Sequence, residues 1–231
     1  MKRAKAPRVV VRQRAGRREL RIDGTYASAR GPRGESGPVW NAMSASVLAV
    51  ANPAPRVLVL GLAGGSVVRG VLSLRPSARF VGVEIDPDVV AAGKRHFGLD
   101  ELPLEVVCTD ALDYLRRTRR RFDLVIDDVF VGRGRRVHKP AWLPEPGFHW
   151  ATRRLRPGGV IVSNTLDETA ALARGLAECV PRVVELSLYG WDNRILIGGS
   201  AGLSARDLRA AVRRATALAE TLPILAVRTR F

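Results

Sequence analysis

Short apolar runs rich in β-branched residues alternate with amphipathic stretches from Arg56 to the end of the chain. The runs have the length and composition of buried strands, and the stretches have the period of helices. The strands are predicted over 56–61, 79–84, 104–108, 122–127, 158–163, 182–188 and 193–198. The helices are predicted over 39–51, 65–74, 87–97, 111–118, 145–155, 167–180 and 205–219. Because apolar strands separated by helices form parallel sheets covered on both faces, the pattern predicts an α/β domain.

The last two predicted strands are separated by residues 189–192, which are too few for a crossover helix. We therefore expect these strands to form an antiparallel hairpin at one edge of the sheet. The predicted sheet is seven-stranded and mostly parallel, with one antiparallel edge strand. This layout resembles the Rossmann-like class I methyltransferase fold.

A small unit is expected ahead of this domain. Segments 8–14 and 18–23 alternate apolar and charged residues on either side of a short Ala-Gly turn, so they predict a β-hairpin. Segment 30–38 is rich in Gly and Pro and predicts a loop. The chain should therefore consist of a basic N-terminal hairpin and loop over 1–38 and a main domain over 39–231.

The first strand of the main domain runs into a turn of small residues. Such residues let the backbone approach a ligand closely, and the free N–H groups that begin the next helix can face it. The same turn is useful without any ligand, so it does not establish nucleotide binding alone. The residues of this candidate cofactor-binding loop, called the glycine loop below, are Gly61, Leu62, Ala63, Gly64 and Gly65.

An acidic residue ends the second strand. Glu84 lies 23 residues after Gly61, where a carboxylate can accept hydrogen bonds from both hydroxyls of a ribose. We take Glu84 and the adjacent Ile85 as candidate cofactor-binding residues. Asp86 precedes Pro87 and is better explained as the N-cap of the next helix. We expect Glu84 to face the crevice, so that its loss would weaken nucleoside binding without impairing folding.

A third acid follows the third strand. Asp110, with Ala111, could accept a hydrogen bond from the amino group of an adenine, although helix capping by Thr109 or Asp110 is an alternative. Ligands of open α/β sheets bind at the carboxyl ends of the strands. Polar sites at three successive strand ends therefore support nucleoside binding more strongly than any one of them alone.

These motifs together resemble the spermidine synthase-like group of the class I S-adenosylmethionine-dependent methyltransferase superfamily over about residues 17–200. The resemblance rests on VLVLGLAGGSVVRG, VGVEIDPDVV, VVCTDALDYL, FDLVIDDVF and LRPGGVIVSN, in that order. It implies that the glycine loop contacts the amino acid or aminopropyl part of S-adenosyl-L-methionine or of its decarboxylated form. It also implies that Glu84 holds the ribose and Asp110 the adenine, and that an acid of the fourth strand lies at the reaction centre.

The chain departs from the aminopropyltransferase pattern at three places. The second acid of the family's Asp-x-x-Asp-Pro pattern falls at Val131, which cannot bind an ammonium group. The acid of the family's glycine loop falls at Gly64, and its Tyr-His-Glu segment has no counterpart around Val39, Trp40 and Asn41. These losses argue against spermidine synthesis and leave cofactor binding intact.

By the same resemblance, the first acid of that pattern falls at Asp128, which is the candidate catalytic residue. A carboxylate can accept a proton from an attacking amine or hydroxyl, or orient it. Asp127 and Asp128 should point to opposite faces of the strand, so one of them should meet the ligand. The alternative is that Asp128 tethers an arginine of the loop 129–147, which is long enough to form a lid or substrate wall.

Length and composition restrict the class of protein further. The chain has 231 residues, 46% of them apolar, which suits one large α/β domain with an appendage. No uncharged apolar run is long enough to span a bilayer and no signal segment is recognisable, so we expect a cytoplasmic protein without membrane contact. Cys108 and Cys179 are too few and too far apart for a disulfide framework or a cysteine-based zinc site, and both are expected in the core. No metal is expected.

The net charge of +16 is unevenly distributed. Segments 1–36 and 111–157 carry +8 and +7, whereas 55–110, which contains the cofactor motifs, carries −1. Such a field could attract nucleic acid. Compositional drift is the alternative, because 34 of the 38 basic residues are Arg in a chain rich in Ala, Gly, Val and Pro.

The sequence therefore predicts an enzyme, an S-adenosylmethionine-dependent transferase, with a methyltransferase on an unidentified small-molecule acceptor as the first hypothesis. An aminopropyltransferase of polyamine synthesis is one alternative. A non-catalytic nucleoside-binding protein that docks on nucleic acid is another, because a fold by itself does not establish turnover. The chain could also form a homodimer, as related synthases often do.

Overall fold

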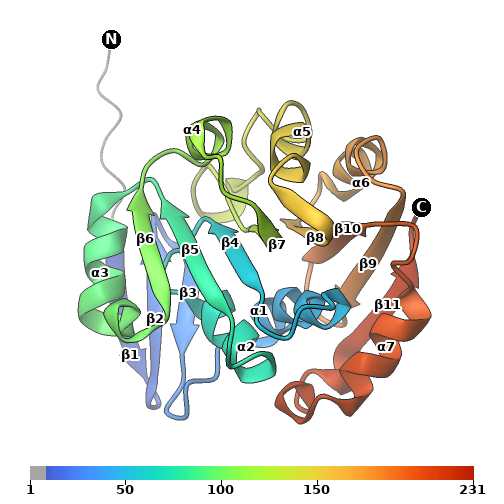
Figure 1. Ribbon diagram of the computed structural model, residues 1–231. Helices are drawn as coiled ribbons and strands as arrows, with labels where there is room; N and C mark the ends of the chain where they lie inside the picture. Colours follow the sequence, from blue (N-terminus) through green and yellow to red (C-terminus); the bar gives the residue numbers. More distant parts are fainter. Residues whose placement is uncertain (1–8) are drawn as a thin grey trace.

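A small three-stranded sheet precedes a larger sheet in the computed structural model (Figure 1). The structure describes residues 9–231, and for Arg135 it describes the backbone only. The first eight residues of the expected 1–38 unit, and with them the start of the predicted 8–14 strand, lie outside the described residues. The strands are β1 (Val9–Arg14), β2 (Arg17–Ile22), β3 (Thr25–Arg30), β4 (Arg56–Leu60), β5 (Arg79–Glu84), β6 (Leu104–Cys108), β7 (Phe122–Asp127), β8 (Leu155–Thr165), β9 (Arg182–Leu188), β10 (Arg194–Gly199) and β11 (Leu225–Thr229). The α-helices are α1 (Pro38–Ala45), α2 (Ser66–Leu74), α3 (Pro87–Phe97), α4 (Ala111–Arg117), α5 (Gly147–Thr152), α6 (Thr169–Ala177) and α7 (Ala205–Arg214).

The large sheet has the strand order β11-β9-β10-β8-β7-β4-β5-β6. Strands β4 to β8 are parallel to one another, whereas β10 is antiparallel to both of its neighbours, β8 and β9. The predicted Rossmann-like class I methyltransferase fold is confirmed by this arrangement. The carboxyl ends of β6, β5, β4, β7 and β8 consequently lie side by side along one edge of the sheet.

Four details differ from the sequence prediction. The sheet has eight strands rather than seven, because β11 pairs with β9 and forms the edge. The antiparallel strand β10 lies inside the sheet and not at its edge. It is inserted between β8 and β9 and pairs with both, so β9 does not contact β8 directly. The N-terminal hairpin gains a third strand, β3, so the small sheet has the order β1-β2-β3. The helix predicted over 205–219 also ends earlier, at Arg214.

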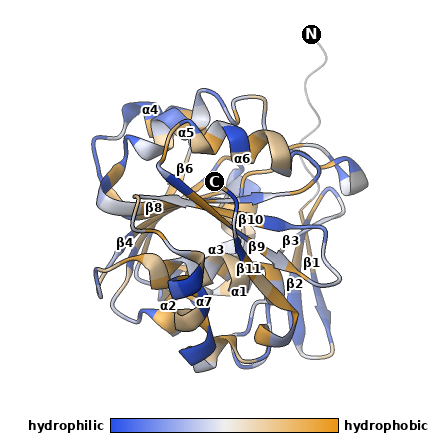
Figure 2. Ribbon diagram, turned by 90° about the vertical axis from the view of Figure 1, so that its right-hand side faces the viewer, coloured by the Kyte–Doolittle hydropathy of each residue, from blue (hydrophilic) through white to orange (hydrophobic). Residues whose placement is uncertain are grey.

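Helices cover both faces of the large sheet. Alternation along β4 places Val57 and Val59 in a core with residues of α1, α2 and α7, and Leu58 and Leu60 in a second core with residues of α4, α5 and α6. Figure 1 shows these two groups of helices on opposite sides of the sheet. Hydrophobic colouring follows the central strands in Figure 2, while the outer turns of α4 and α7 are hydrophilic. Packing on both faces holds the central strands of the large sheet, and with them their carboxyl ends, in place.

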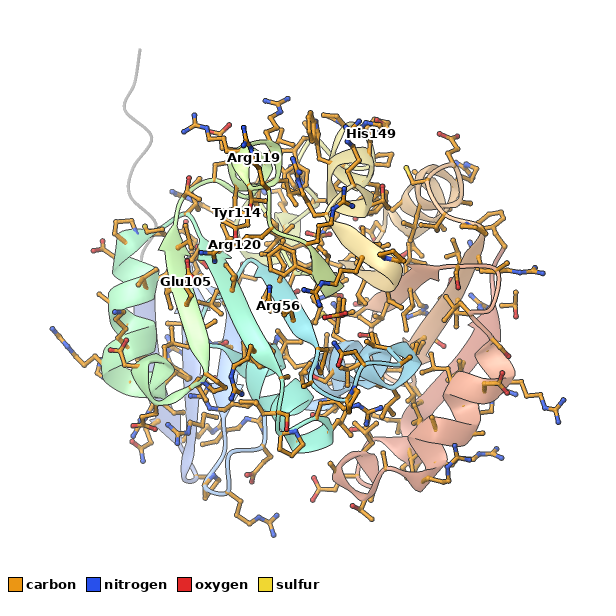
Figure 3. The ribbon with its side chains drawn as sticks, in the orientation of Figure 1. Arg56, Glu105, Tyr114, Arg119, Arg120 and His149 are labelled. Carbon is orange, nitrogen blue, oxygen red and sulfur yellow. The ribbon has the colours of Figure 1, made fainter. Side chains whose placement is uncertain are left out.

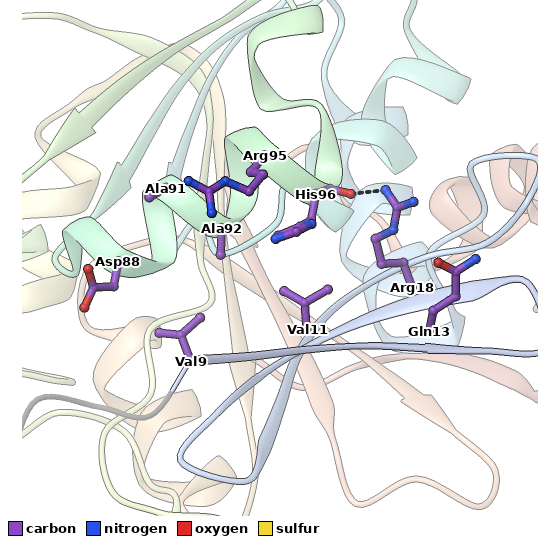
Figure 4. A pocket seen from close by; sticks show the side chains of 9 residues that line it. All are labelled: Val9, Val11, Gln13, Arg18, Asp88, Ala91, Ala92, Arg95 and His96. Atoms are coloured by element: carbon purple, nitrogen blue, oxygen red, sulfur yellow. Dashed lines mark hydrogen bonds between the residues drawn. The ribbon is translucent and has the colours of Figure 1, made fainter.

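The small sheet packs against α3. Leu20 of β2 and Phe97 of α3 are fully buried in one cluster, which also contains Ala63 of the glycine loop. Arg18 donates a hydrogen bond to the carbonyl of His96, and Figure 4 shows this contact beside a hollow between β1, β2 and α3. Because α3 follows directly after Glu84, this packing brings the β2–β3 turn toward the carboxyl ends of the parallel strands.

Two further expectations concern exposure. Among residues 9–231, no helix has the length and apolar content needed to cross a bilayer. The expectation that both cysteines lie in the core is wrong, because Cys108 is exposed and Cys179 is half-buried. Cys108 is the last residue of β6, an edge strand of the large sheet that pairs with β5 on one side only.

Gly61 should not tolerate a side chain. It has a φ of +79°, and an added Cβ would lie 2.7 Å from the carbonyl oxygen of Asp128. Gly61→Ala should therefore lower the free energy of unfolding by about 2–4 kcal/mol, from left-handed strain plus overpacking against backbone. Gly190 has the same φ of +79° with no atom within 4 Å of the added Cβ. Gly190→Ala should lose only about 1 kcal/mol in urea denaturation, and equal losses for the two variants would contradict the close approach.

Candidate active site

A cavity of about 410 Å³ opens at the carboxyl ends of the parallel strands. The residues predicted from the sequence that line it are Gly61, Ala63, Glu84, Ile85, Asp110, Ala111 and Asp128. They follow four adjacent strands in the sheet order β6-β5-β4-β7. The sequence-predicted residues thus converge on one cavity, with the exception of part of the glycine loop.

Leu62, Gly64 and Gly65 do not line this cavity. Leu62 is buried in the core, and the N–H of Gly64 donates to Oγ of Ser28 at 2.9 Å. The N–H of Gly65 donates to the carbonyl of Leu62, also at 2.9 Å. The backbone groups of these residues therefore hold the loop and the small sheet together, and the cavity meets the loop at Gly61 and Ala63.

The Glu84 carboxylate joins the ends of β4 and β5. Its Oε2 accepts a hydrogen bond from the N–H of Ala63 at 3.0 Å, and its Oε1 accepts from the N–H groups of Ile85 at 3.0 Å and Asp86 at 3.3 Å. Burial raises the pKa of Glu84, although these three donors oppose the shift. A carboxylate offers about four acceptor positions. Glu84 therefore holds the glycine loop and keeps some capacity for a ligand, so its loss should also affect folding, in contrast to the sequence-based expectation.

Asp110 caps a helix, which is one of the two roles that the sequence left open, and the adenine contact stays a prediction. Its Oδ1 accepts a hydrogen bond from the N–H of Asp113 at 3.0 Å and caps α4, while the residue also lines the cavity. Asp86 caps α3 in the same way, as predicted, by accepting from the N–H of Asp88 at 2.8 Å. The capping bond fixes the Asp110 carboxylate at the cavity wall next to Ala111.

Asp127 and Asp128 have different surroundings. Asp127 is buried, and its Oδ2 lies 2.6 Å from Nζ of Lys139. Asp128 lines the cavity, and its Oδ1 accepts a hydrogen bond from Nδ2 of Asn164 at 2.8 Å. The lysine therefore neutralises Asp127, and Asp128 is the acid of this pair that lines the cavity.

Burial raises the pKa of Asp128 to about 6. Hydrogen bonds from Asn164 and Trp40 and the charge of Lys139 oppose the shift, whereas the charge of Asp127 adds to it. A carboxylate with this pKa is ionised at neutral pH and is a stronger base than an ordinary aspartate. These properties suit a proton acceptor in the cavity.

Sequence reasoning missed two asparagines beside Asp128. Asn164 lies near the end of β8, and its side-chain oxygen accepts a hydrogen bond from Nδ2 of Asn193 at 2.9 Å. The bonds from Asn193 to Asn164 and from Asn164 to Asp128 orient the carboxylate. The strand-end rule that identified Glu84 could also have identified Asn164. Asn193 offered no such signal, because its position follows from the insertion of β10 next to β8.

Two segments far apart in the sequence roof the cavity. The small sheet contributes Ile22, Thr25, Tyr26 and Ala27. The loop after β7 forms a narrow flap in which Val131 and His138 exchange two backbone hydrogen bonds of 2.9 Å. Arg133 of this flap pairs with Asp23 at 3.1 Å, and the N–H of Gly134 donates to Oγ1 of Thr25 at 3.1 Å. Residues of this loop thus line the cavity, and Arg133 ties the flap to the small sheet through Asp23.

The charge of the cavity is opposite to that of the protein. Its described lining residues include the carboxylates of Glu84, Asp110 and Asp128 and no Lys or Arg. The arginine run 116–121 precedes β7 and therefore lies toward the amino ends of the strands, away from the cavity. Figure 3 shows Arg119 and Arg120 near α4, and Arg120 pairs with Glu105 at 2.6 Å. Within residues 9–231, no group of three His, Cys, Asp or Glu could hold a metal ion.

Comparisons with known proteins connect this chain to a family. The family model described as "Spermine/spermidine synthase domain" matches residues 41–182. A polyamine aminopropyltransferase of Synechococcus sp. (strain JA-2-3B'a(2-13)) is 40% identical over 80 residues, which are 32% of this chain and 26% of that protein. One of Chromobacterium violaceum is 34% identical over 110 residues, 47% of this chain and 41% of that protein. An eEF1A lysine and N-terminal methyltransferase homolog of Drosophila melanogaster is 38% identical over 77 residues, 32% of this chain and 11% of that protein. The chain spans less than half the length of these curated relatives.

Solved structures show the same fold. Human methyltransferase-like protein 13 in complex with SAH is 25% identical, with a TM-score of 0.66, and the match covers 81% of this chain and 93% of that one. A probable spermidine synthase from Corynebacterium glutamicum is 19% identical, with a TM-score of 0.73, and the match covers 96% of this chain and 88% of that one. A spermidine synthase in complex with the transition state analogue AdoDATO is 20% identical, with a TM-score of 0.64, and the match covers 90% of this chain and 80% of that one.

Replacement of Glu84 should affect nucleoside binding and stability together. Glu84→Ala removes a charged acceptor and leaves the N–H of Ala63 without its partner. We expect nucleoside binding to weaken by about 1.5–3 kcal/mol in calorimetry and the free energy of unfolding to fall by about 1–3 kcal/mol. The matched control is Asp88→Ala, at an exposed residue of α3, which should change neither quantity by more than about 0.5 kcal/mol. Unchanged nucleoside affinity in Glu84→Ala would contradict the ribose role.

Proposed function

The chain belongs to the spermine/spermidine synthase domain family, and from this membership we propose that it transfers an aminopropyl group from decarboxylated S-adenosylmethionine to a small-molecule amine. The curated relatives named as polyamine aminopropyltransferases support this transfer over the methyl transfer that was our first hypothesis from the sequence. The match to a spermidine synthase in complex with the transition state analogue AdoDATO supports a nucleoside donor.

The charge of the cavity is the observation that carries the proposal. Decarboxylated S-adenosylmethionine is a sulfonium with an ammonium and no carboxylate, whereas S-adenosylmethionine also carries a carboxylate. Three carboxylates and no Lys or Arg line the cavity among its described residues. A cationic donor is attracted by this lining, and an additional carboxylate on the donor would be repelled without a compensating cation.

The proposed roles follow the order of the strands. Glu84 accepts hydrogen bonds from the ribose, and Asp110 accepts one from the adenine amino group. Gly61 and Ala63 let the aminopropyl part pass close to the backbone between β4 and β7. The roof formed by the small sheet and the flap excludes water from this arrangement.

The reaction needs alignment and one proton acceptor. The lone pair of the acceptor nitrogen forms a bond to the carbon next to the sulfonium, and the carbon–sulfur bond breaks with its electron pair remaining on sulfur. The products are the aminopropylated amine and 5′-methylthioadenosine. Asp128 orients the amine and accepts its proton, while Asn164 and Asn193 hold the carboxylate in place.

Methyl transfer to an amine is the second candidate. It is favoured by the similarity to human methyltransferase-like protein 13 bound to SAH and to the Drosophila melanogaster methyltransferase homolog. The ribose and adenine contacts would be the same for both donors. The donors differ in the carboxylate, which S-adenosylmethionine carries and its decarboxylated form lacks. The partners suggested by the net charge and by the family, nucleic acid and a second copy of the chain, stay predictions.

Donor preference decides between the two reactions. We expect decarboxylated S-adenosylmethionine and 5′-methylthioadenosine to bind at least tenfold more tightly than S-adenosylmethionine in calorimetry, because the cavity offers the carboxylate no cation. S-adenosylhomocysteine should bind as weakly as S-adenosylmethionine. Tighter binding of the two carboxylate-bearing compounds would reject aminopropyl transfer, and binding of none of the four would reject a nucleoside site.

Asp128 should act in turnover and not in nucleoside binding. Asp128→Asn keeps the size of the side chain and an oxygen for Asn164, and we expect it to reduce kcat about 100-fold or more while affinity for the uncharged nucleoside 5′-methylthioadenosine stays within a factor of three. Because Asp128 with a pKa of about 6 must be deprotonated to accept a proton, kcat/KM in the wild type should fall more steeply below pH 6 than above it. This change of slope should vanish in the variant. Loss of folding, or of nucleoside binding, in Asp128→Asn would make Asp128 structural.

A further inference from the structure

The half of the cavity beyond Asp128 is apolar. In the sheet order, the lining carboxylates follow β6, β5 and β7, and the strands on the far side of β7 contribute no acid among the described lining residues. The walls there come from Phe130, Val131, Trp142, Leu166 and Trp191. Resting on the proposed aminopropyl transfer, we infer that the acceptor is a monoamine with an apolar body rather than a diamine, and that Val131 is a specificity-determining residue.

The two asparagines in this half are hydrogen-bonded in a chain that ends at Asp128, and neither carries a charge that could pair with an ammonium. Asn164 donates to Asp128 at 2.8 Å and accepts from Asn193 at 2.9 Å. Asp128 is thus the one lining carboxylate that can meet the reacting nitrogen. The second ammonium of a diamine would need another anion on this side, because an ammonium buried without a partner is strongly disfavoured.

The neighbouring acid cannot supply that anion. Asp127 is paired with Lys139 at 2.6 Å, and both side chains are nearly inaccessible. Nζ of Lys139 also lies 4.4 Å from the centre of the Phe130 ring, directly behind the cavity wall. The pair of Lys139 and Asp127 leaves no uncompensated negative charge behind that wall for a second ammonium, whereas an alkyl or aryl chain would bury apolar area against Trp142 and Leu166.

Val131 is placed where a different side chain could change this preference. It lines the cavity, is 40% exposed, and is held by backbone hydrogen bonds to His138 that do not depend on its side chain. The flap that carries it is fixed by the pair between Arg133 and Asp23. An aspartate at this position would therefore add a carboxylate to the apolar wall with little effect on the backbone.

The test compares two amines of equal chain length, butylamine and 1,4-diaminobutane, with decarboxylated S-adenosylmethionine as donor. We expect the wild type to use butylamine with a kcat/KM at least tenfold higher. Val131→Asp should reverse the preference, whereas Val131→Asn, of the same size and without charge, should not. Butylamine and the diamine are also titrated into protein saturated with 5′-methylthioadenosine, so that affinity is measured apart from turnover.

The outcomes distinguish failure of the monoamine inference from failure of the proposed aminopropyl transfer. A wild type that prefers 1,4-diaminobutane in turnover and in binding overturns the monoamine inference and leaves aminopropyl transfer intact. Failure of Val131→Asp to gain diamine affinity overturns the role of Val131. Absence of 5′-methylthioadenosine formation with both amines overturns the proposed function, and the titration then still decides which class of amine the apolar half accepts.

Discussion

The carboxylates of Glu84, Asp127 and Asp128 lie largely inside the fold, where a polar group needs partners, and each has partners of a different kind. Three backbone N–H groups surround Glu84, a lysine neutralises Asp127, and an asparagine bonds Asp128. Each solution has a structural consequence. The first holds the glycine loop against β5, the second anchors the loop after β7, and the third connects β7 to β8. The cavity exists because these three connections hold neighbouring strand ends at fixed positions.

The strand order also separates charges across the molecule. The acids gather at the carboxyl ends of β6, β5 and β7, while the arginine run 116–121 precedes β7 and lies toward the opposite ends. A net charge of +16 therefore does not describe what a small ligand meets in the cavity. The long-range repulsion of a cation is opposed locally by carboxylates at short distance, where electrostatic interactions are strongest.

Local patterns were sufficient for the parallel strands and for the acids at their ends, because each is encoded within a few residues. Glu84, Asp110 and Asp128 all line the cavity, as their strand-end positions suggested. Strand β3 was missed because its small and polar residues, TYASAR, carry little strand signal. The interior position of β10 and the ion pair of Asp127 with Lys139 were missed for another reason. Both depend on which segments meet in space, and a hairpin at the edge would have satisfied the same local rules.

The packing of the small sheet on α3 has a consequence for the order of events during synthesis. Leu20 is buried against Phe97, so strands β1 to β3 leave the ribosome long before the surface that covers them exists. Until α3 is made, the apolar face of these strands is exposed, which favours association with other chains or with chaperones. Completion of the roof is therefore a late step that joins the earliest part of the described chain to a helix made some seventy residues later.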